Sequence, residues 1–120
     1  MSTNTDTIDR LVEGYNASDA RTFADCFALD ASVYEHPSIL TQQGRNEIFA
    51  YYQKLFAEFP QNRTEILHRI VFDTKVIDHE RVRRSPDAEP FEVLTIYEMS
   101  GGLIQRVDFI RKQSVVFQAS

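Results

Sequence analysis

The first sixty residues carry apolar side chains at the spacing of an α-helix. One stripe falls at positions i, i+3, i+4 and i+7 and consists of Ile8, Leu11, Val12 and Tyr15. This period predicts a helix over residues 5–18, because side chains three and four positions apart share one helix face. The same reasoning predicts a short helix over residues 20–29 and a longer one over residues 45–59, which Pro60 ends.

Other segments alternate with a period of two, as strands do. Residues 31–36 predict a strand that Pro37 ends, followed by a loop through Gly44. Four longer strands rich in Val, Ile, Thr, Phe and Tyr are predicted at Glu65–Phe72, Lys75–Arg84, Phe91–Met99 and Leu103–Ser114. Short turns separate these four, so neighbours are expected to be antiparallel. Helices followed by a meander predict an α+β fold, with the helices covering one face of a curved sheet.

Composition and charge narrow the range of functions. The 120 residues are 42% hydrophobic, which is ordinary for a globular protein and predicts a single domain over residues 1–120. The net charge of −5 disfavours nucleic acid or an anionic membrane as a partner. A single cysteine, Cys26, and the lack of a recognisable secretory signal lead us to expect a cytoplasmic protein. His36, His68 and His79 are far apart in the sequence, so no metal site is expected.

Three strings of residues carry a family resemblance. They are Phe27-Ala28-Leu29-Asp30-Ala31-Ser32-Val33, Gly44-Arg45-Asn46-Glu47-Ile48 and the hairpin Ile96 to Ile104. Their order and spacing resemble the nuclear-transport-factor-2-like (NTF2-like) superfamily, in particular its SnoaL-like and ketosteroid-isomerase-like proteins. The resemblance implies a cystatin-like α+β roll, in which a cone-shaped antiparallel sheet wraps around three N-terminal helices. It also implies an apolar pocket at the open end of the cone, which suits small ligands.

Two enzyme groups of this superfamily direct attention to the end of the first strand. His36, which precedes a proline, matches the general-base position of the ketosteroid isomerases. Leu11 and Thr95 take the positions of the two residues that form the oxyanion hole in those enzymes. The string that begins at Tyr34 is similar to the Tyr-Glu-Asn string of limonene-epoxide hydrolases. The resemblance therefore implies that Tyr34 and His36 face the pocket.

Strand alternation locates a second group of polar residues. If Val76 faces the cavity, then Asp78, Glu80 and Val82 face it too, and His79 points outward. A carboxylate desolvated in an apolar pocket has a raised pKa and acts as a general acid or base near neutral pH. Two alternatives remain open. A one-residue bulge would turn His79 inward instead, and an exposed hairpin would leave these charges simply solvated.

These residues predict general acid–base chemistry without a cofactor, in the form of isomerisation, dehydration or hydration of a compact, largely apolar substrate. We expect His36 or Asp78 to be the base, with Tyr34 and Glu80 as hydrogen-bonding or proton-donating partners. Further ligand contacts are expected from Leu11, Tyr15, Phe56, Val76, Val82, Thr95, Val107 and Phe109. The alternative is a non-catalytic module of the same fold that binds a small ligand or dimerises.

The outer face of the sheet predicts a homodimer. Ile77, Ile96 and Phe117 are expected to point outward, where they would leave apolar surface uncovered in a monomer. The family resemblance implies the same arrangement, since the outer sheet face often pairs two subunits in these proteins.

Overall fold

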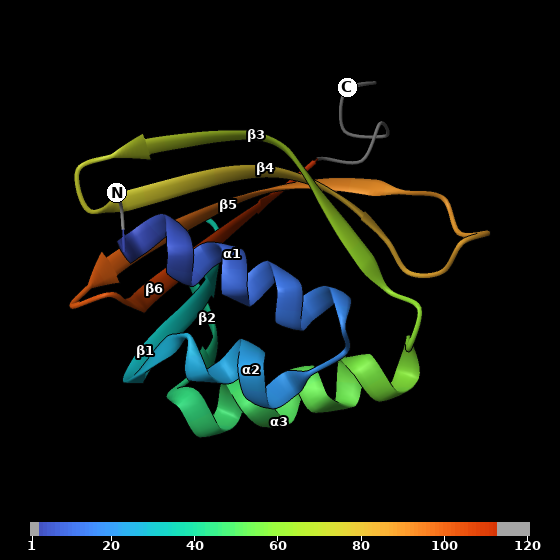
Figure 1. The fold of residues 1–120 in the computed structure, drawn as a ribbon, viewed down its shortest axis with the longest axis horizontal. Coiled ribbons are helices and arrows are strands. Elements are labelled where there is room, and N and C mark those ends of the chain that lie inside the picture. Colours follow the sequence, from blue (N-terminus) through green and yellow to red (C-terminus); the bar gives the residue numbers. More distant parts are fainter. Residues whose placement is uncertain (1–2, 113–120) are drawn as a thin grey trace.

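The computed structural model describes residues 3–112, which form three helices and six strands (Figure 1). In chain order the elements are α1 (Thr3–Asn16), α2 (Ala20–Asp25), β1 (Phe27–Glu35), β2 (Ile39–Gln43), α3 (Arg45–Glu58), β3 (Arg63–Phe72), β4 (Lys75–Arg83), β5 (Phe91–Ser100) and β6 (Leu103–Arg111). The predicted α+β class is confirmed, and the three helices lie together on one side of a curved, unclosed sheet.

The six strands form one sheet in the order β2-β1-β6-β5-β4-β3. The hairpins from β3 to β6 are antiparallel, as their short turns require. One pair departs from the expected antiparallel sheet, because β1 lies parallel to β6, with Val33 opposite Val107. This pair joins the N-terminal half of the chain to its last described strand.

The largest differences from the sequence prediction lie between the second and third helices. The second helix ends at Asp25, and the strand begins at Phe27 rather than at residue 31. Phe27 and Ala31 are buried whereas Leu29 between them is 75% exposed, so the start of β1 departs from strict alternation. Its register with β6 shifts between Phe27 and Ser32. Strand β2 falls in the segment that was predicted as a loop through Gly44. Its adjacent Ile39 and Leu40 are both exposed, so the strand has no alternating apolar face that would have indicated it.

The core lies between the helices and the inner face of the sheet. Ile8 of α1, Ile48 of α3 and Ile104 of β6 are fully buried in it. Phe23 of α2 packs against Tyr52 of α3 with ring centroids 4.2 Å apart, which fixes the two helices against each other. None of the described helices is long and apolar enough to cross a membrane.

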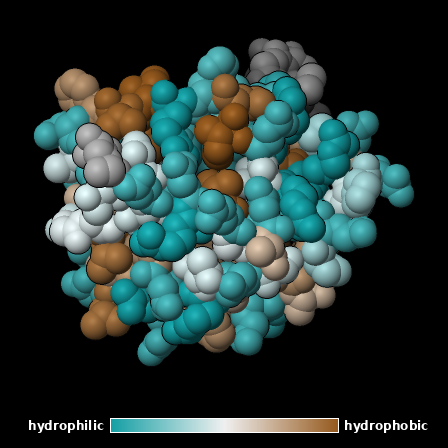
Figure 2. Space-filling model, viewed as in Figure 1, coloured by the Kyte–Doolittle hydropathy of each residue, from teal (hydrophilic) through white to brown (hydrophobic). Residues whose placement is uncertain are grey.

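Charged side chains alternate with apolar ones on the outer face. His79 of β4 contacts Glu92 of β5, and Ile77 and Ile96 are half-buried neighbours on the same two strands. Figure 2 shows a mainly hydrophilic surface with separate apolar patches on the face viewed there. Phe117 lies outside the described residues, and the homodimer stays a prediction.

Candidate active site

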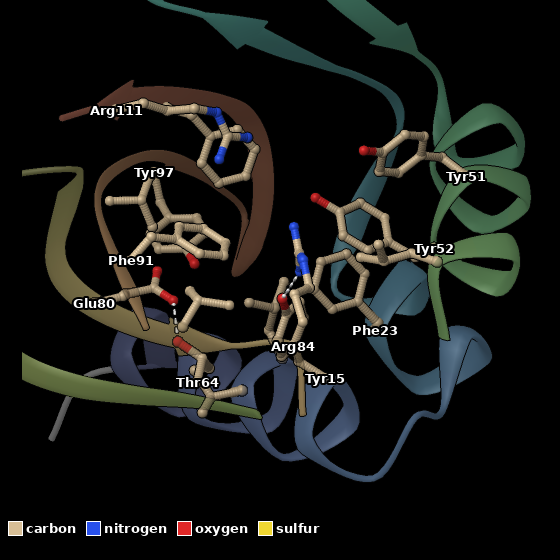
Figure 3. Close-up of a pocket in the computed structure, with 16 residues that line it drawn as sticks. Tyr15, Phe23, Tyr51, Tyr52, Thr64, Glu80, Arg84, Phe91, Tyr97 and Arg111 are labelled. Atoms are coloured by element: carbon tan, nitrogen blue, oxygen red, sulfur yellow. Dashed lines mark hydrogen bonds between the residues drawn. The ribbon is translucent and has the colours of Figure 1, made fainter. Parts of the chain in front are cut away.

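An aromatic cavity lies between the helices and the inner face of β3 to β6 (Figure 3). The cavity volume is about 60 Å³, and the cavity is only partly enclosed. The helices contribute Tyr15, Phe23, Tyr51 and Tyr52, and the strands contribute Phe91, Tyr97 and Phe109. A small, partly open space lined by aromatic rings suits a compact apolar group.

Glu80 of β4 is the carboxyl group of this cavity. Its side chain is buried, and each carboxylate oxygen accepts one hydrogen bond of 2.8 Å, from the hydroxyl of Thr64 on one side and of Thr95 on the other. Burial raises the pKa of Glu80 above the ordinary value, although both threonine hydroxyls act in the opposite direction. The result is a carboxyl group of fixed orientation whose proton is held more tightly than in water.

Tyrosine hydroxyls provide uncharged polar groups in the same cavity. Tyr52 and Tyr97 are buried, and their hydroxyls have no hydrogen-bond partner within residues 3–112. Burial raises the pKa of both phenols, so they remain protonated and able to donate. Figure 3 shows the Tyr52 hydroxyl directed into the space between α3 and the sheet.

A second polar group connects α1, the start of β3 and the end of β4. The Tyr15 hydroxyl accepts hydrogen bonds from Asn62 (2.7 Å) and from Arg84 (3.2 Å). Asn62 is fully buried, and its amide oxygen also accepts from Arg84 at 3.3 Å. These contacts hold the Arg84 guanidinium at the wall of the cavity (Figure 3).

A third polar group borders the cavity at the end of β6. Arg111 donates to both carboxylate oxygens of Glu35 on β1, at distances of 2.8 to 3.0 Å. This bidentate pair neutralises the charge of Arg111. Gln42 of β2 lies beside it, and its buried amide oxygen has no hydrogen-bond partner among the described residues.

A family comparison assigns the chain to a known domain family. The family model described as SnoaL-like domain matches residues 8–107. The chain belongs to this SnoaL-like family. The resemblance drawn from the sequence is thereby confirmed. A search of curated proteins found no match.

Solved structures share the SnoaL-like fold. An uncharacterized cystatin-fold protein from Novosphingobium aromaticivorans is 30% identical with a TM-score of 0.85, and the match covers 92% of this chain and 100% of that chain. A putative polyketide cyclase from Sinorhizobium meliloti is 19% identical with a TM-score of 0.74, over 91% and 99% of the two chains. A Catenulispora acidiphila protein with a ketosteroid isomerase-like fold is 13% identical with a TM-score of 0.74, over 91% and 85%. The last two show likeness of fold alone.

The predicted alternation of β4 holds in this SnoaL-like domain. Val76, Asp78, Glu80 and Val82 are buried on the inner face, and His79 points outward to Glu92. Asp78, however, does not border the cavity. Its carboxylate is fully buried and accepts two hydrogen bonds from a single guanidinium, that of Arg69 on β3.

The face of β1 that turns to the cavity is the opposite of the predicted one. Tyr34 is expected to face inward, but it lies on the outer face, with the Arg106 guanidinium 3.8 Å from its ring centroid. The parallel pairing with β6 explains the correction, since Glu35 falls opposite Phe109 on the inner face and Tyr34 opposite Asp108 on the outer one. His36 is exposed just beyond the strand and is not among the residues that line the cavity.

Half of the predicted ligand contacts line the cavity. Leu11, Tyr15, Val82 and Phe109 border it. The others are buried but do not border it, namely Phe56, Val76, Thr95 and Val107. Thr95 lies directly behind Glu80 and contacts its carboxylate, so it shapes the site without lining it.

The cavity contains polar residues that sequence reasoning did not select. Tyr97 shares the alternation of Val93 and Thr95 on β5, so the strand pattern was sufficient to find it. Tyr52 and Arg84 carried no such signal, because a helical tyrosine is most often a core residue and Arg84 follows the last residue of β4. Within the described residues, no three His, Cys, Asp or Glu side chains gather to hold a metal ion.

The raised pKa of Glu80 predicts a pH-dependent change in stability. Because the folded state binds this proton more tightly than the unfolded state does, the contribution of Glu80 to stability is lost as the pH rises through its folded pKa. Glutamine does not titrate, so the Glu80→Gln variant should not lose this stability as the pH rises. We expect the free energy of unfolding of the variant, relative to the wild type, to increase between about pH 4 and about pH 8 in urea titrations.

Glu92→Gln is the matched control for this measurement. Glu92 lies on the outer face, and its hydrogen bond from His79 lowers its pKa, so its contribution is present at higher pH and lost on acidification. That loss falls at or below about pH 4, so the stability of the Glu92→Gln variant relative to the wild type should stay nearly constant between about pH 4 and about pH 8. A flat difference for Glu80→Gln across the range would contradict a raised pKa.

Proposed function

We propose that this SnoaL-like domain is a cofactor-independent enzyme in which Glu80 moves a proton on a compact, largely apolar substrate. The observation that carries the proposal is a buried carboxyl group at the wall of an aromatic cavity, fixed by two threonine hydroxyls, with a pKa raised by burial. A carboxyl group tuned in this way is suited to general acid–base catalysis near neutral pH. This assigns to Glu80 the base role that the sequence analysis gave to His36 or Asp78.

The reaction class follows from the other groups around the carboxylate. Ionised Glu80 removes a proton from carbon next to a carbonyl, which leaves an enolate on the substrate and a neutral carboxylic acid on the protein. The same acid then returns the proton at a different carbon, which isomerises the substrate, or protonates a departing hydroxyl, which dehydrates it. Tyr52 and Tyr97 are protonated donors whose hydroxyls have no partner within residues 3–112, so they support stabilisation of the enolate oxygen.

Thr95 acts as a positioning residue in this proposal. Its hydroxyl donates to Glu80 and favours the ionised form, so Thr95→Val should raise the pKa of Glu80 further. We expect the acidic limb of the pH–rate profile to move to higher pH, with turnover at alkaline pH largely retained. Thr95→Ser keeps the hydroxyl and should leave the limb in place. A uniform loss at every pH in Thr95→Val would indicate a structural role instead.

The proposal is tested by proton exchange in deuterated water. Compact cyclic ketones and 1,3-diketones are incubated with the protein, and loss of the acidic C–H signal is followed by proton nuclear magnetic resonance (NMR). We expect protein-dependent exchange that requires Glu80. Binding without exchange across these classes would overturn catalysis and favour a ligand-binding module.

A further inference from the structure

Arg84 has charge that the rest of the cavity does not balance. Among the described residues that line the cavity, three are charged, namely Glu80, Arg84 and Arg111. Arg111 is neutralised by Glu35, and Glu80 is held by two hydroxyls rather than by a cation. Within residues 3–112, no carboxylate lies within 4.0 Å of the Arg84 guanidinium. A half-buried guanidinium without an ion pair attracts an anion more strongly than one in water does.

The geometry of Arg84 is fixed before any ligand arrives. One terminal nitrogen, Nη1, donates to the Tyr15 hydroxyl and to the Asn62 amide oxygen. The guanidinium carbon lies 5.5 Å from the ring centroid of Phe59 and 4.9 Å from that of Phe91, so aromatic rings hold it as well. Little conformational entropy is therefore lost when the guanidinium binds a ligand.

One edge of this fixed guanidinium remains available. An arginine side chain has five N–H donors, and the bonds described above engage only Nη1. Nε and Nη2 have no hydrogen-bond acceptor among the described residues. Figure 3 shows the guanidinium next to Tyr15 and directed toward the space that Tyr52 borders. Two parallel N–H groups of this kind match the two oxygens of a carboxylate.

We propose that Arg84 binds a carboxylate of the ligand, and that the natural substrate is a compact, ring-bearing carboxylic acid. The ring packs among the aromatic side chains of the cavity, and the carboxylate lies at the Arg84 end of it. Calling this acid the substrate rests on the proposed function. Binding of the acid does not depend on catalysis by Glu80.

The test compares two probes that share a ring and differ in whether the group attached to it is a carboxylate or a neutral amide. Benzoate and benzamide have the same ring and nearly the same shape, and their binding to the full chain is followed by NMR titration. We expect the wild type to bind benzoate about tenfold more tightly than benzamide, as a charge-assisted pair should provide. Arg84→Gln should weaken benzoate binding by about the same factor and leave benzamide unchanged.

Arg83→Gln is the control for net charge. Arg83 is the preceding residue, is exposed, and donates to the Ala88 carbonyl rather than to the cavity. The Arg83→Gln variant loses the same charge as Arg84→Gln, but it should still bind benzoate more tightly than benzamide. Arg84→Lys keeps the charge without the planar pair of donors, so this variant should keep only part of the preference for benzoate over benzamide.

The outcomes separate this inference from the proposed function. Equal binding of the two probes by the wild type, no benzoate binding at about 20 mM, or an unchanged preference in Arg84→Gln would overturn the carboxylate site. Should Arg84→Gln fail to fold, the comparison of probes in the wild type and in Arg84→Lys still decides. Glu80→Gln should lose proton exchange but keep benzoate binding, so either proposal can fail while the other stands.

Discussion

We expect the Glu80→Gln variant to exchange substrate protons about 10²- to 10⁴-fold more slowly than the wild type, because it lacks the carboxyl group. The variant should fold like the wild type. Glutamine has nearly the same volume, and its amide oxygen can accept from one of Thr64 and Thr95 while its amide N–H donates to the hydroxyl oxygen of the other. It cannot take up or release a proton in the required range. The exchange assay by NMR measures the loss, and circular dichroism checks the fold.

Two further variants show whether the loss is specific to this carboxylate. Glu92→Gln removes a carboxylate from the adjacent strand on the outer face and should keep wild-type exchange. His36→Ala removes an exposed side chain outside the cavity and should do the same. Full turnover in Glu80→Gln would contradict the assignment, and a comparable loss in His36→Ala would return the base role to the histidine.

Replacing Arg69→Met is expected to have the largest effect on stability. Asp78 is fully buried, and the Arg69 guanidinium binds both of its oxygens, at 2.6 and 2.9 Å. Without Arg69, a buried carboxylate loses the cation that compensates for its missing hydration. We expect a loss of about 3–5 kcal/mol in the free energy of unfolding, measured by urea titration.

Asp9→Asn isolates the buried part of this network. Arg69 also contacts Asp9 at 2.7 Å, but the Asp9 side chain is 61% exposed. An exposed ion pair contributes about 0–1 kcal/mol, so this variant should be close to the wild type. A loss of less than about 1 kcal/mol in Arg69→Met would show that Asp78 does not depend on its partner.

The contact between Arg69 and Asp78 also shows where sequence reasoning reached its limit. Alternation correctly placed Asp78 and Glu80 on one face of β4. The alternation does not indicate which of the two carboxylates pairs with a cation, because that depends on a register shift in β3 between Ile66 and His68. The extra residue turns Arg69 to the inner face, opposite Asp78, and no glycine or proline in this stretch marks the irregularity.

The first strand illustrates a different limit. The alternation itself was readable, with Tyr34 on one face and Glu35 on the other. Which face turns inward depends on the partner strand, and that partner is β6, which lies far away in the sequence. The fold class was predictable because helix stripes and strand alternation are local patterns. The site was only partly predictable, because its polar groups meet through register and long-range pairing.

The parallel pairing of β1 with β6 has a consequence for how the chain reaches its native state. Val33 and Val107 are partners although 107 − 33 = 74 positions separate them. A contact of such long range forms late, since the intervening chain must first be ordered. During synthesis, the edge of β1 that pairs with β6 has no such partner until β6 has left the ribosome. The Glu35–Arg111 pair spans the same two strands, so this side of the cavity forms only when β6 pairs with β1.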